Sequence, residues 1–168
     1  MSTSVSRASL LRGNLFGTKD VVRPPWALPE AEFTDICERC DDCADSCPEG
    51  IIEAGPAGFP IITFAIGECT FCGECTDVCR SGAFGPRDNA PWQVEITVTA
   101  DCMSAQGVTC RVCEGKCQAD AISFPVTGAQ FSAAGKPAIN VAACNGCGAC
   151  VGPCPSEAID LNPQPGGL

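Results

Sequence analysis

The sequence contains neither histidine nor tyrosine, and its aromatic residues are 8 phenylalanines and 2 tryptophans among 168 residues. Without histidine, the chain cannot form a Ser–His–Asp triad, a Cys–His pair or the histidine-ligated site of most zinc hydrolases. Large side chains are few, whereas the turn formers glycine and proline number 18 and 14. Such a chain builds only a thin apolar core for its length, so something besides side-chain packing must help to hold the fold.

Positive charge is also scarce. Lysine and arginine together number 10, against 20 for aspartate and glutamate, which gives a net charge of −10 and a pI near 4.3. A nucleic-acid binder needs a basic patch, and a protein that binds anionic lipid needs a basic cluster. We therefore expect partners that include neither a nucleic acid nor an anionic membrane surface.

Long apolar runs are missing as well. No stretch approaches the roughly 20 apolar residues that cross a bilayer, so we expect no transmembrane segment. Residues 1–20 lack the apolar run of about 7 or more residues that a secretory signal peptide requires. We therefore expect a cytoplasmic protein. Because that compartment is reducing, its cysteines are expected to bind metal rather than to form disulfides.

Cysteine, by contrast, is abundant, with 16 residues in quartets that leave none over. Three quartets have the spacing C-x2-C-x2-C-x3-C, and the third in chain order begins early, with the spacing C-x7-C-x2-C-x3-C. In chain order, the quartets are Cys37, Cys40, Cys43 and Cys47; Cys69, Cys72, Cys75 and Cys79; Cys102, Cys110, Cys113 and Cys117; and Cys144, Cys147, Cys150 and Cys154.

This spacing is that of the bacterial ferredoxin motif for a [4Fe–4S] cluster, in which proline follows the fourth cysteine and that cysteine serves the other cluster of a pair. Pro48 and Pro155 follow the first and fourth quartets, whereas Arg80 follows the second. Three cysteines in a tight loop can wrap three corners of a cubane, but the loop cannot turn back to the fourth corner. The pattern predicts four [4Fe–4S] clusters, with all 16 cysteines as iron ligands.

The ferredoxin rule pairs consecutive quartets and exchanges their fourth cysteines, which defines four sites. Site 1 is Cys37, Cys40, Cys43 and Cys79; site 2 is Cys69, Cys72, Cys75 and Cys47; site 3 is Cys102, Cys110, Cys113 and Cys154; and site 4 is Cys144, Cys147, Cys150 and Cys117. The early position of Cys102 makes site 3 the one that departs most from the motif.

Zinc sites and disulfides are the other uses that cysteines of this kind can have. Zinc sites commonly combine C-x2-C pairs that lie far apart in the sequence, often with histidine. Disulfides would require export to an oxidising compartment. The repeated spacing and the lack of histidine favour iron–sulfur clusters over both.

Short apolar segments repeat around the quartets. An apolar pair follows each fourth cysteine, at residues 51–52, 83–84, 121–122 and 158–159. We expect a short helix, begun by Pro48 or Pro155, to turn such a pair toward a cluster. Strand-like runs precede three quartets, at residues 61–66, 92–99 and 138–141.

The fold class that these signals predict is α+β: two tandem bacterial-ferredoxin-like lobes, with short β-hairpins and short helices around four iron–sulfur clusters. We expect the lobes at residues 30–90 and 91–168, each with two 4Fe-4S motifs. Residues 1–29 contain no cysteine. They are either a flexible tail whose Trp26 packs on the first lobe or an N-terminal partner-binding arm, because a basic apolar segment on an acidic body is a ready docking element.

Three features outside the cysteines carry a family resemblance: SRASLLRG at residues 6–13, RPPWA at residues 23–27, and Phe33 shortly before the first quartet. Together with the quartets, including the early third one, they resemble the NapF family, the ferredoxin-type accessory proteins of periplasmic nitrate reductase. The resemblance covers nearly the whole chain. It implies a cytoplasmic iron–sulfur protein that binds the catalytic molybdoenzyme subunit in its precursor form. It also implies that the protein assists maturation of that subunit before export, by electron transfer or cluster assembly.

A second function stays open, namely a general low-potential electron carrier, or polyferredoxin, that takes electrons from a redox donor and has no assembly role. The Arg7-Ala8 pair stands where family members often have two arginines, and the segment lacks an apolar stretch, which favours retention in the cytoplasm. We expect no enzymatic activity, because nothing in the sequence resembles a general acid/base pair and iron–sulfur clusters carry single electrons.

Overall fold

Short helices alternate with short strands in the computed structural model, which describes residues 21–92, 94–124 and 135–163. The helical elements are α2 (Glu30–Ile36), α3 (Asp42–Asp45), the 3-10 turn η1 (Pro56–Gly58), α4 (Glu74–Asp77) and α5 (Val112–Lys116). The strands are β1 (Ile52–Ala54), β2 (Pro60–Ile62), β3 (Val94–Val98), β4 (Ile122–Ser123), β5 (Ala138–Ile139) and β6 (Ile159–Pro163). Helices this short are unstable alone in water, so tertiary contacts must hold them.

The strands form two-stranded antiparallel sheets that follow one pairing plan twice. β1 pairs with β2, and β4 pairs with β5, so that in each case the strand after one quartet pairs with the strand ahead of the next. β3 pairs with β6, which joins the segment ahead of the third quartet to the segment after the fourth. The equivalent segments of the first two quartets meet at an isolated bridge between Ala27 and Phe84.

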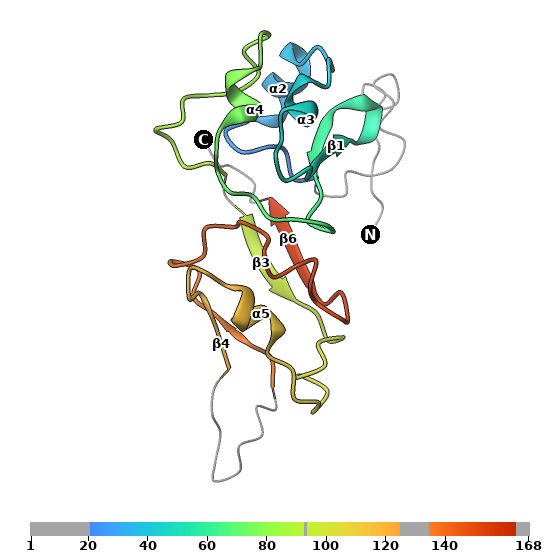
Figure 1. The fold of residues 1–168 in the computed structure, drawn as a ribbon, viewed down its shortest axis with the longest axis vertical. Coiled ribbons are helices and arrows are strands. Elements are labelled where there is room, and N and C mark those ends of the chain that lie inside the picture. The colour runs from blue at the N-terminus through green and yellow to red at the C-terminus, as the bar shows by residue number, and fades with distance from the viewer. Residues whose placement is uncertain (1–20, 93, 125–134, 164–168) are drawn as a thin grey trace, which may run out of the picture.

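We call residues 21–92 the first half and residues 94–163 the second half. Figure 1 shows them at opposite ends of an elongated molecule, with α2, α3, α4 and β1 toward one end and α5 and β4 toward the other. The β3–β6 ribbon lies between these ends. The helices that follow the cysteine loops are therefore distributed over both halves.

Each half has a hydrophobic core that is built around cysteines. In the first half, Cys43 and Cys75 belong to a buried cluster with Val22, Ile51, Ile52, Ile62 and Phe64. In the second half, Cys113 and Cys150 belong to a buried cluster with Ile122, Phe124 and Ile159. The apolar core and the cysteine sites therefore share one surface.

The predicted helix after Pro48 or Pro155 is wrong. Gly50 and Glu157, three residues after the fourth cysteines of their quartets, adopt left-handed backbone conformations with φ of 63° and 49°. A left-handed residue ends any helix, and the chain turns directly into β1 or β6. The apolar pairs are nevertheless largely buried, including Ile51, Ile52, Ala83, Ala121, Ile122, Ala158 and Ile159.

The predicted strands are found only in part. Of residues 92–99, β3 contains Val94–Val98. Of residues 61–66, only the first two belong to β2. Of residues 138–141, only Ala138–Ile139 forms β5, because the Asn140 side chain accepts the N–H of Ala142 at 3.2 Å and starts a turn.

Residues 21–28 pack against the first half. Val22, Pro24 and Trp26 are buried. The indole N–H of Trp26 donates to the Asn89 carbonyl at 3.0 Å, and the Val22 carbonyl accepts the N–H of Ile62 at 2.7 Å. This part of the expected arm is thus held on the first half, whereas residues 1–20 lie outside the described residues.

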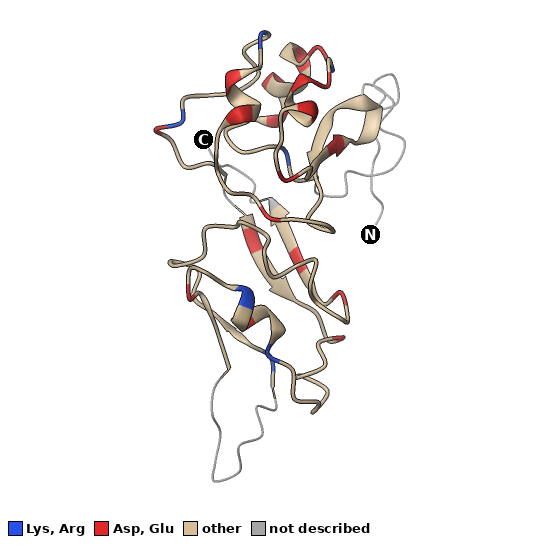
Figure 2. Ribbon diagram, viewed as in Figure 1, with Lys and Arg blue, Asp and Glu red and all other residues tan. Residues whose placement is uncertain are grey.

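Charge is distributed unevenly between the halves. The first half contains 13 acidic and 4 basic residues, and the second half contains 6 acidic and 3 basic residues. Figure 2 shows that many of the acidic residues lie on α2, α3 and α4. The negative charge of the molecule is therefore concentrated around the cysteine loops of the first half.

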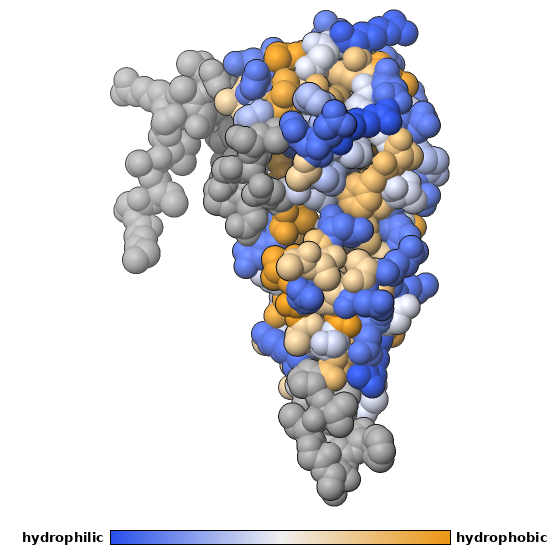
Figure 3. Space-filling view, turned by 90° about the vertical axis from the view of Figure 1, so that its left-hand side faces the viewer, coloured by the Kyte–Doolittle hydropathy of each residue, from blue (hydrophilic) through white to orange (hydrophobic). Residues whose placement is uncertain are grey.

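Apolar side chains also reach the surface. Figure 3 shows them on one face as patches between hydrophilic residues. Among the residues that the structure describes, the exposed large hydrophobic side chains are Ile66, Val108, Val112 and Val141. Within the part of the chain that the structure describes, none of the helices has the length and apolar character needed to cross a membrane.

Candidate iron–sulfur sites

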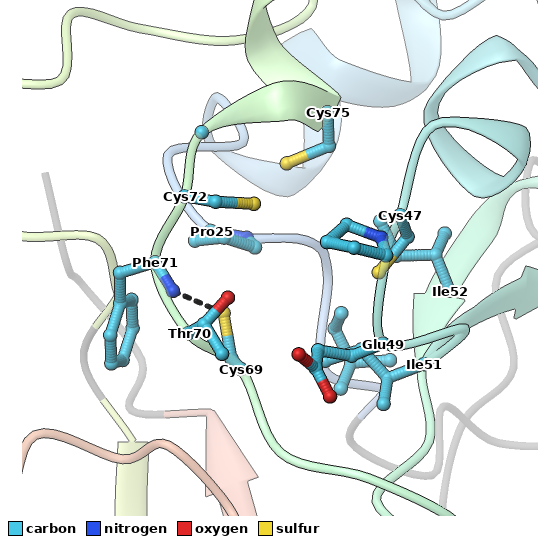
Figure 4. A pocket seen from close by; sticks show the side chains of 13 residues that line it. Pro25, Cys47, Glu49, Ile51, Ile52, Cys69, Thr70, Phe71, Cys72 and Cys75 are labelled. Atoms are coloured by element: carbon cyan, nitrogen blue, oxygen red, sulfur yellow. Dashed lines mark hydrogen bonds between the residues drawn. The ribbon is translucent and has the colours of Figure 1, made fainter.

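Site 2 surrounds a cavity. Cys69, Cys72 and Cys75 line it from the second quartet, and Cys47 reaches it from the first. Figure 4 shows Cys69, Cys72 and Cys75 along one side and Cys47 across from them. The cavity holds about 340 Å³ of empty space, part of it open to solvent. These four residues are the crossed set that the ferredoxin rule predicts.

Site 3 surrounds a second cavity, in the second half, with about 330 Å³ of empty space. Its cysteines come from both quartets of that half: Cys102, Cys110, Cys113 and Cys154. The early Cys102 reaches the cavity because the extra residues fold into a compact turn. In that turn the N–H of Gln106 donates to the Cys102 carbonyl at 3.1 Å, and the N–H of Val108 donates to the Met103 carbonyl at 2.9 Å.

The cysteines of site 4 lie close enough to affect one another's ionisation. Burial raises the pKa of Cys147, and the charges of Glu68, Cys117 and Cys144 raise it further. Burial also raises the pKa of Cys150 to about 12, with Cys147 and Cys144 among the contributing charges. Cys117, from the third quartet, is therefore near the cysteines of the fourth.

The structure brings together the three cysteines of site 1 that come from the first quartet. Burial, followed by the charges of Cys37 and Cys40, raises the pKa of Cys43 to about 11. The contacts that the structure describes for Cys79 are with its own turn, where its sulfur lies 3.4 Å from the Ser81 hydroxyl. Burial would raise the pKa of Cys79, but Ser81 and the backbone N–H groups of residues 81–83 outweigh burial and lower it.

The loops of three quartets share one backbone conformation. The residues two after the first cysteine and one after the second are left-handed, namely Arg39 and Asp41, Phe71 and Gly73, and Gly146 and Gly148. This conformation costs a non-glycine residue roughly 1–3 kcal/mol, and such strain persists at functional sites. The third quartet differs, with φ of −135° at Arg111.

All four quartets end in the same turn. The third residue after the fourth cysteine is left-handed in each, at Gly50, Gly82, Asp120 and Glu157. In two of these turns the next N–H donates to the cysteine sulfur, from Ala121 to Cys117 at 3.2 Å and from Ala158 to Cys154 at 3.4 Å. N–H donors aimed at sulfur stabilise the thiolate form, which is the form that binds metal.

The donor set fits an iron–sulfur cluster better than it fits a single metal ion. A zinc site brings its sulfur ligands to about 2.3 Å from one ion. Among the described residues, no group of three or more cysteine or acidic side chains is arranged to hold one ion. The cysteines of sites 2 and 3 instead line two cavities in sets of four, the number of thiolates that a [4Fe–4S] cluster takes. Burial raises the pKa of Cys75 to about 12, so cluster binding there must displace the thiol proton.

Arg87 is a residue at site 2 that sequence reasoning missed. Its guanidinium forms an ion pair with Asp77 and donates to the Thr76 hydroxyl at 3.0 Å and to the Cys72 carbonyl at 3.4 Å. It lies over Gly73, where any Cβ would meet the guanidinium. No motif marks Arg87, because it reaches the second quartet through tertiary folding.

Comparison with known proteins defines the class. Residues 36–83 match the 4Fe-4S dicluster domain, a segment that contains the first two quartets. Together with the cysteine cavities, this match makes the chain an iron–sulfur protein of the ferredoxin type. The domain match and the 16 cysteines support [4Fe–4S] clusters as its cofactors.

Relatives define the family more closely. The chain is 36% identical over 159 residues to the ferredoxin-type protein NapF of Escherichia coli K12, covering 95% of each chain. It is 43% identical to NapF of Haemophilus influenzae, over 84% of this chain and 78% of that one. It is 32% identical to the methylamine utilization ferredoxin-type protein MauM of Methylophilus methylotrophus, over 88% and 73% of the two chains. The chain belongs to the NapF family of ferredoxin-type proteins.

Proposed function

We propose that this protein is a polyferredoxin that carries four [4Fe–4S] clusters, one at each of sites 1 to 4, with all 16 cysteines as ligands. When bound, such a cluster supplies reversible one-electron transfer. The observation that carries the proposal is a cavity lined by four cysteines from two quartets, found once in each half, at sites 2 and 3. Because Cys102 lines its cavity together with its three partners, its early position is compatible with a complete site 3.

The architecture that we propose is two tandem ferredoxin-like lobes, at residues 30–90 and 91–168, after an N-terminal partner-binding arm at residues 1–29. The repeated strand pairing supports the tandem, since β1–β2 corresponds to β4–β5 and the Ala27–Phe84 bridge corresponds to β3–β6. The shared turn after every fourth cysteine supports it as well.

The described residues suit electron transfer rather than catalysis. Cys40 and Cys72 are exposed, which gives sites 1 and 2 a short path to the surface for an electron. Cys75 and Cys150 are buried in the two cores, which keeps water from those corners of their sites. Backbone N–H groups that point at sulfur lower the energy of its negative charge and so tune the potential. We therefore assign the protein no enzymatic reaction of its own.

The partner that we propose is the catalytic molybdoenzyme subunit of periplasmic nitrate reductase, in its precursor form in the cytoplasm. In this proposal the protein assists maturation of that subunit before export, by electron transfer or cluster assembly. The support is family membership together with the basic apolar segment at residues 6–13, which no cysteine site requires.

The second candidate function is a general low-potential electron carrier without an assembly role. It is favoured by the relatives named for methylamine utilization, one of which matches this chain at 32% identity over 88% of its length. Electron transfer is the property that both candidate functions share. The two differ in whether nitrate reductase is made active without this protein.

Nitrate reductase purified from a strain that lacks this protein separates the two functions. If the protein assists maturation, the enzyme is expected to be largely inactive with an artificial dye donor and partly recoverable by reconstitution. If the protein only carries electrons, dye-linked activity is normal and only delivery from the physiological donor falls. Normal dye-linked activity would therefore overturn the maturation role.

A further inference from the structure

The cysteine loops of sites 2 and 4 touch across the junction between the two halves. The N–H of Cys69, in the second quartet, donates to the carbonyl of Cys147, in the fourth, at 2.8 Å. Beside this contact the Gln118 amide donates to the Glu68 carboxylate at 3.4 Å. The two loops are therefore joined backbone to backbone, although 78 residues of sequence separate these cysteines.

Trp92 fills the space between the same two loops. Its indole N–H donates to the Asn145 carbonyl at 3.2 Å, inside the fourth quartet. Its ring packs edge-on against Phe71, inside the second quartet, with ring centroids 5.6 Å apart, and against Phe64 at 6.1 Å. Trp92 thus contacts both quartets at once.

Two glycines of the fourth quartet let the halves approach each other. Gly148 has φ of +79°, and a Cβ there would run into the Phe64 ring. A Cβ at Gly152 would lie 2.6 Å from the Phe64 carbonyl oxygen and 2.9 Å from that of Ala65, closer than real Cβ atoms come to backbone. Any larger residue at these positions must push the two halves apart.

Within each half, the paired sites are also neighbours. α3 and α4, which contain Cys43 and Cys75, pack against each other. Cys43 of site 1 and Cys75 of site 2 belong to the same buried cluster. In the second half, Cys113 of site 3 and Cys150 of site 4 likewise belong to one buried cluster. Figure 1 shows α3 and α5 toward opposite ends of the molecule.

We propose that Trp92, Gly148 and Gly152 are positioning residues that hold sites 2 and 4 side by side, so that the four sites stand in the spatial order 1, 2, 4, 3. The inference rests on the proposed function, because it requires clusters at these sites. Neighbouring sites are those that can exchange one electron, and the site that gives it is oxidised as the site that takes it is reduced. Sites 1 and 3 are then the two ends, one facing a one-electron donor and the other a one-electron acceptor.

The test compares Gly152→Ala with Gly115→Ala, and neither glycine has a left-handed φ. A Cβ at Gly115 meets nothing within 4 Å, so this variant is the matched control. The readout is the electron paramagnetic resonance spectrum after reduction with dithionite, in which neighbouring reduced clusters broaden and split each other's signals. Iron and sulfide contents are expected to equal those of the wild type in both variants. Gly152→Ala is expected to lose the part of the splitting that comes from sites 2 and 4, whereas Gly115→Ala keeps the wild-type spectrum.

Two further variants isolate the pairs of sites. Cys40→Ala with Cys110→Ala empties sites 1 and 3, and the remaining sites 2 and 4 are expected to split each other's signals. Cys72→Ala with Cys144→Ala leaves sites 1 and 3, which are expected to give narrow signals without splitting. Splitting in the second variant, or its absence in the first with both clusters present by iron analysis, would overturn the proposed order. A wild-type protein without iron and sulfide would contradict the proposed function instead.

Discussion

The second half joins the segments that flank its quartets through the five residue pairs of the β3–β6 ladder, whereas the first half joins the equivalent segments through the single Ala27–Phe84 bridge. Side chains replace the ladder in the first half. Phe33 packs edge-on against Phe84 with ring centroids 5.9 Å apart, and Arg23 lies over the Phe33 ring while it pairs with Glu30 at 2.7 Å. Both halves hold two cysteine quartets. The segments that flank these quartets are joined by backbone pairing in the second half and mainly by aromatic packing in the first.

The largest effect is expected when the iron and sulfide are removed. Both cores contain cysteines, so we expect the apo-protein to lose most of its cooperative structure. The second half should lose its amide protection entirely, whereas residues 21–36 should keep some, because Phe33 packs on Phe84 and the Trp26 indole N–H donates to the Asn89 carbonyl, two contacts that involve no cysteine. Hydrogen exchange of the holo- and apo-proteins measures this difference, and a protected β3–β6 ladder in the apo-protein would contradict it.

Loss of a single site is the next largest effect. Cys154→Ala is expected to empty site 3, whose cavity Cys154 lines, and to leave Cys144, Cys147 and Cys150 with their cluster. Iron analysis should show a loss of about 4 iron atoms from about 16 per chain. Ser156→Ala is the control, since the Ser156 hydroxyl lies 3.8 Å from the Cys154 sulfur but adds no ligand. A variant that loses site 4 and keeps site 3 would show that the fourth cysteines are not exchanged.

The positions of Cys47 and Cys154, which line cavities with cysteines of the neighbouring quartets, could be predicted from the sequence, because a loop with x2 spacing cannot return to its own fourth corner. The spacing therefore anticipated that Cys47 would reach Cys69, Cys72 and Cys75. It could not anticipate the left-handed backbone of Arg39 and Phe71, since residue preferences alone would place glycine there.

Long-range contacts were the other limit of prediction. The strand expected at residues 61–66 ends at Ile62, because Phe64 leaves it to pack against Trp92 and the fourth quartet. Neither the Cys69–Cys147 contact nor the position of Arg87 has a local signal in the sequence. Such features depend on how two distant segments meet, which spacing and periodicity do not encode.

Truncation of the N-terminus is expected to give a smaller effect, and one that differs between the two halves. Deletion of residues 1–20 should leave every cluster in place, because no cysteine lies before Cys37. Deletion of residues 1–29 should destabilise the first half, since loss of a buried tryptophan such as Trp26 costs about 3–5 kcal/mol by itself.

Thermal melting followed through the visible absorbance of the clusters measures both truncations. The longer deletion should lower the temperature at which about half of the cluster absorbance is lost, and the shorter one should leave that temperature unchanged. Equal melting of the two truncated proteins would show that residues 21–29 add no stability to the first half. The shorter form is also the one with which to measure binding to the nitrate reductase precursor, because its fold is expected to be intact.

The smallest effect is expected at Arg87, which places a positive charge beside site 2 in the more acidic half. Arg87→Gln removes that charge and leaves Asp77 without its ion-pair partner, so the surroundings of Cys72 and Cys75 become more negative. More negative surroundings favour the oxidised cluster, so the reduction potential of site 2 should fall while that of site 3 does not change. Potentiometric titration followed by electron paramagnetic resonance measures both sites in one sample. Arg87→Lys keeps the charge but loses the planar donor fork, so a potential close to that of the wild type would identify charge as the cause. An equal fall in both variants would instead assign the effect to the hydrogen bonds with Thr76 and the Cys72 carbonyl.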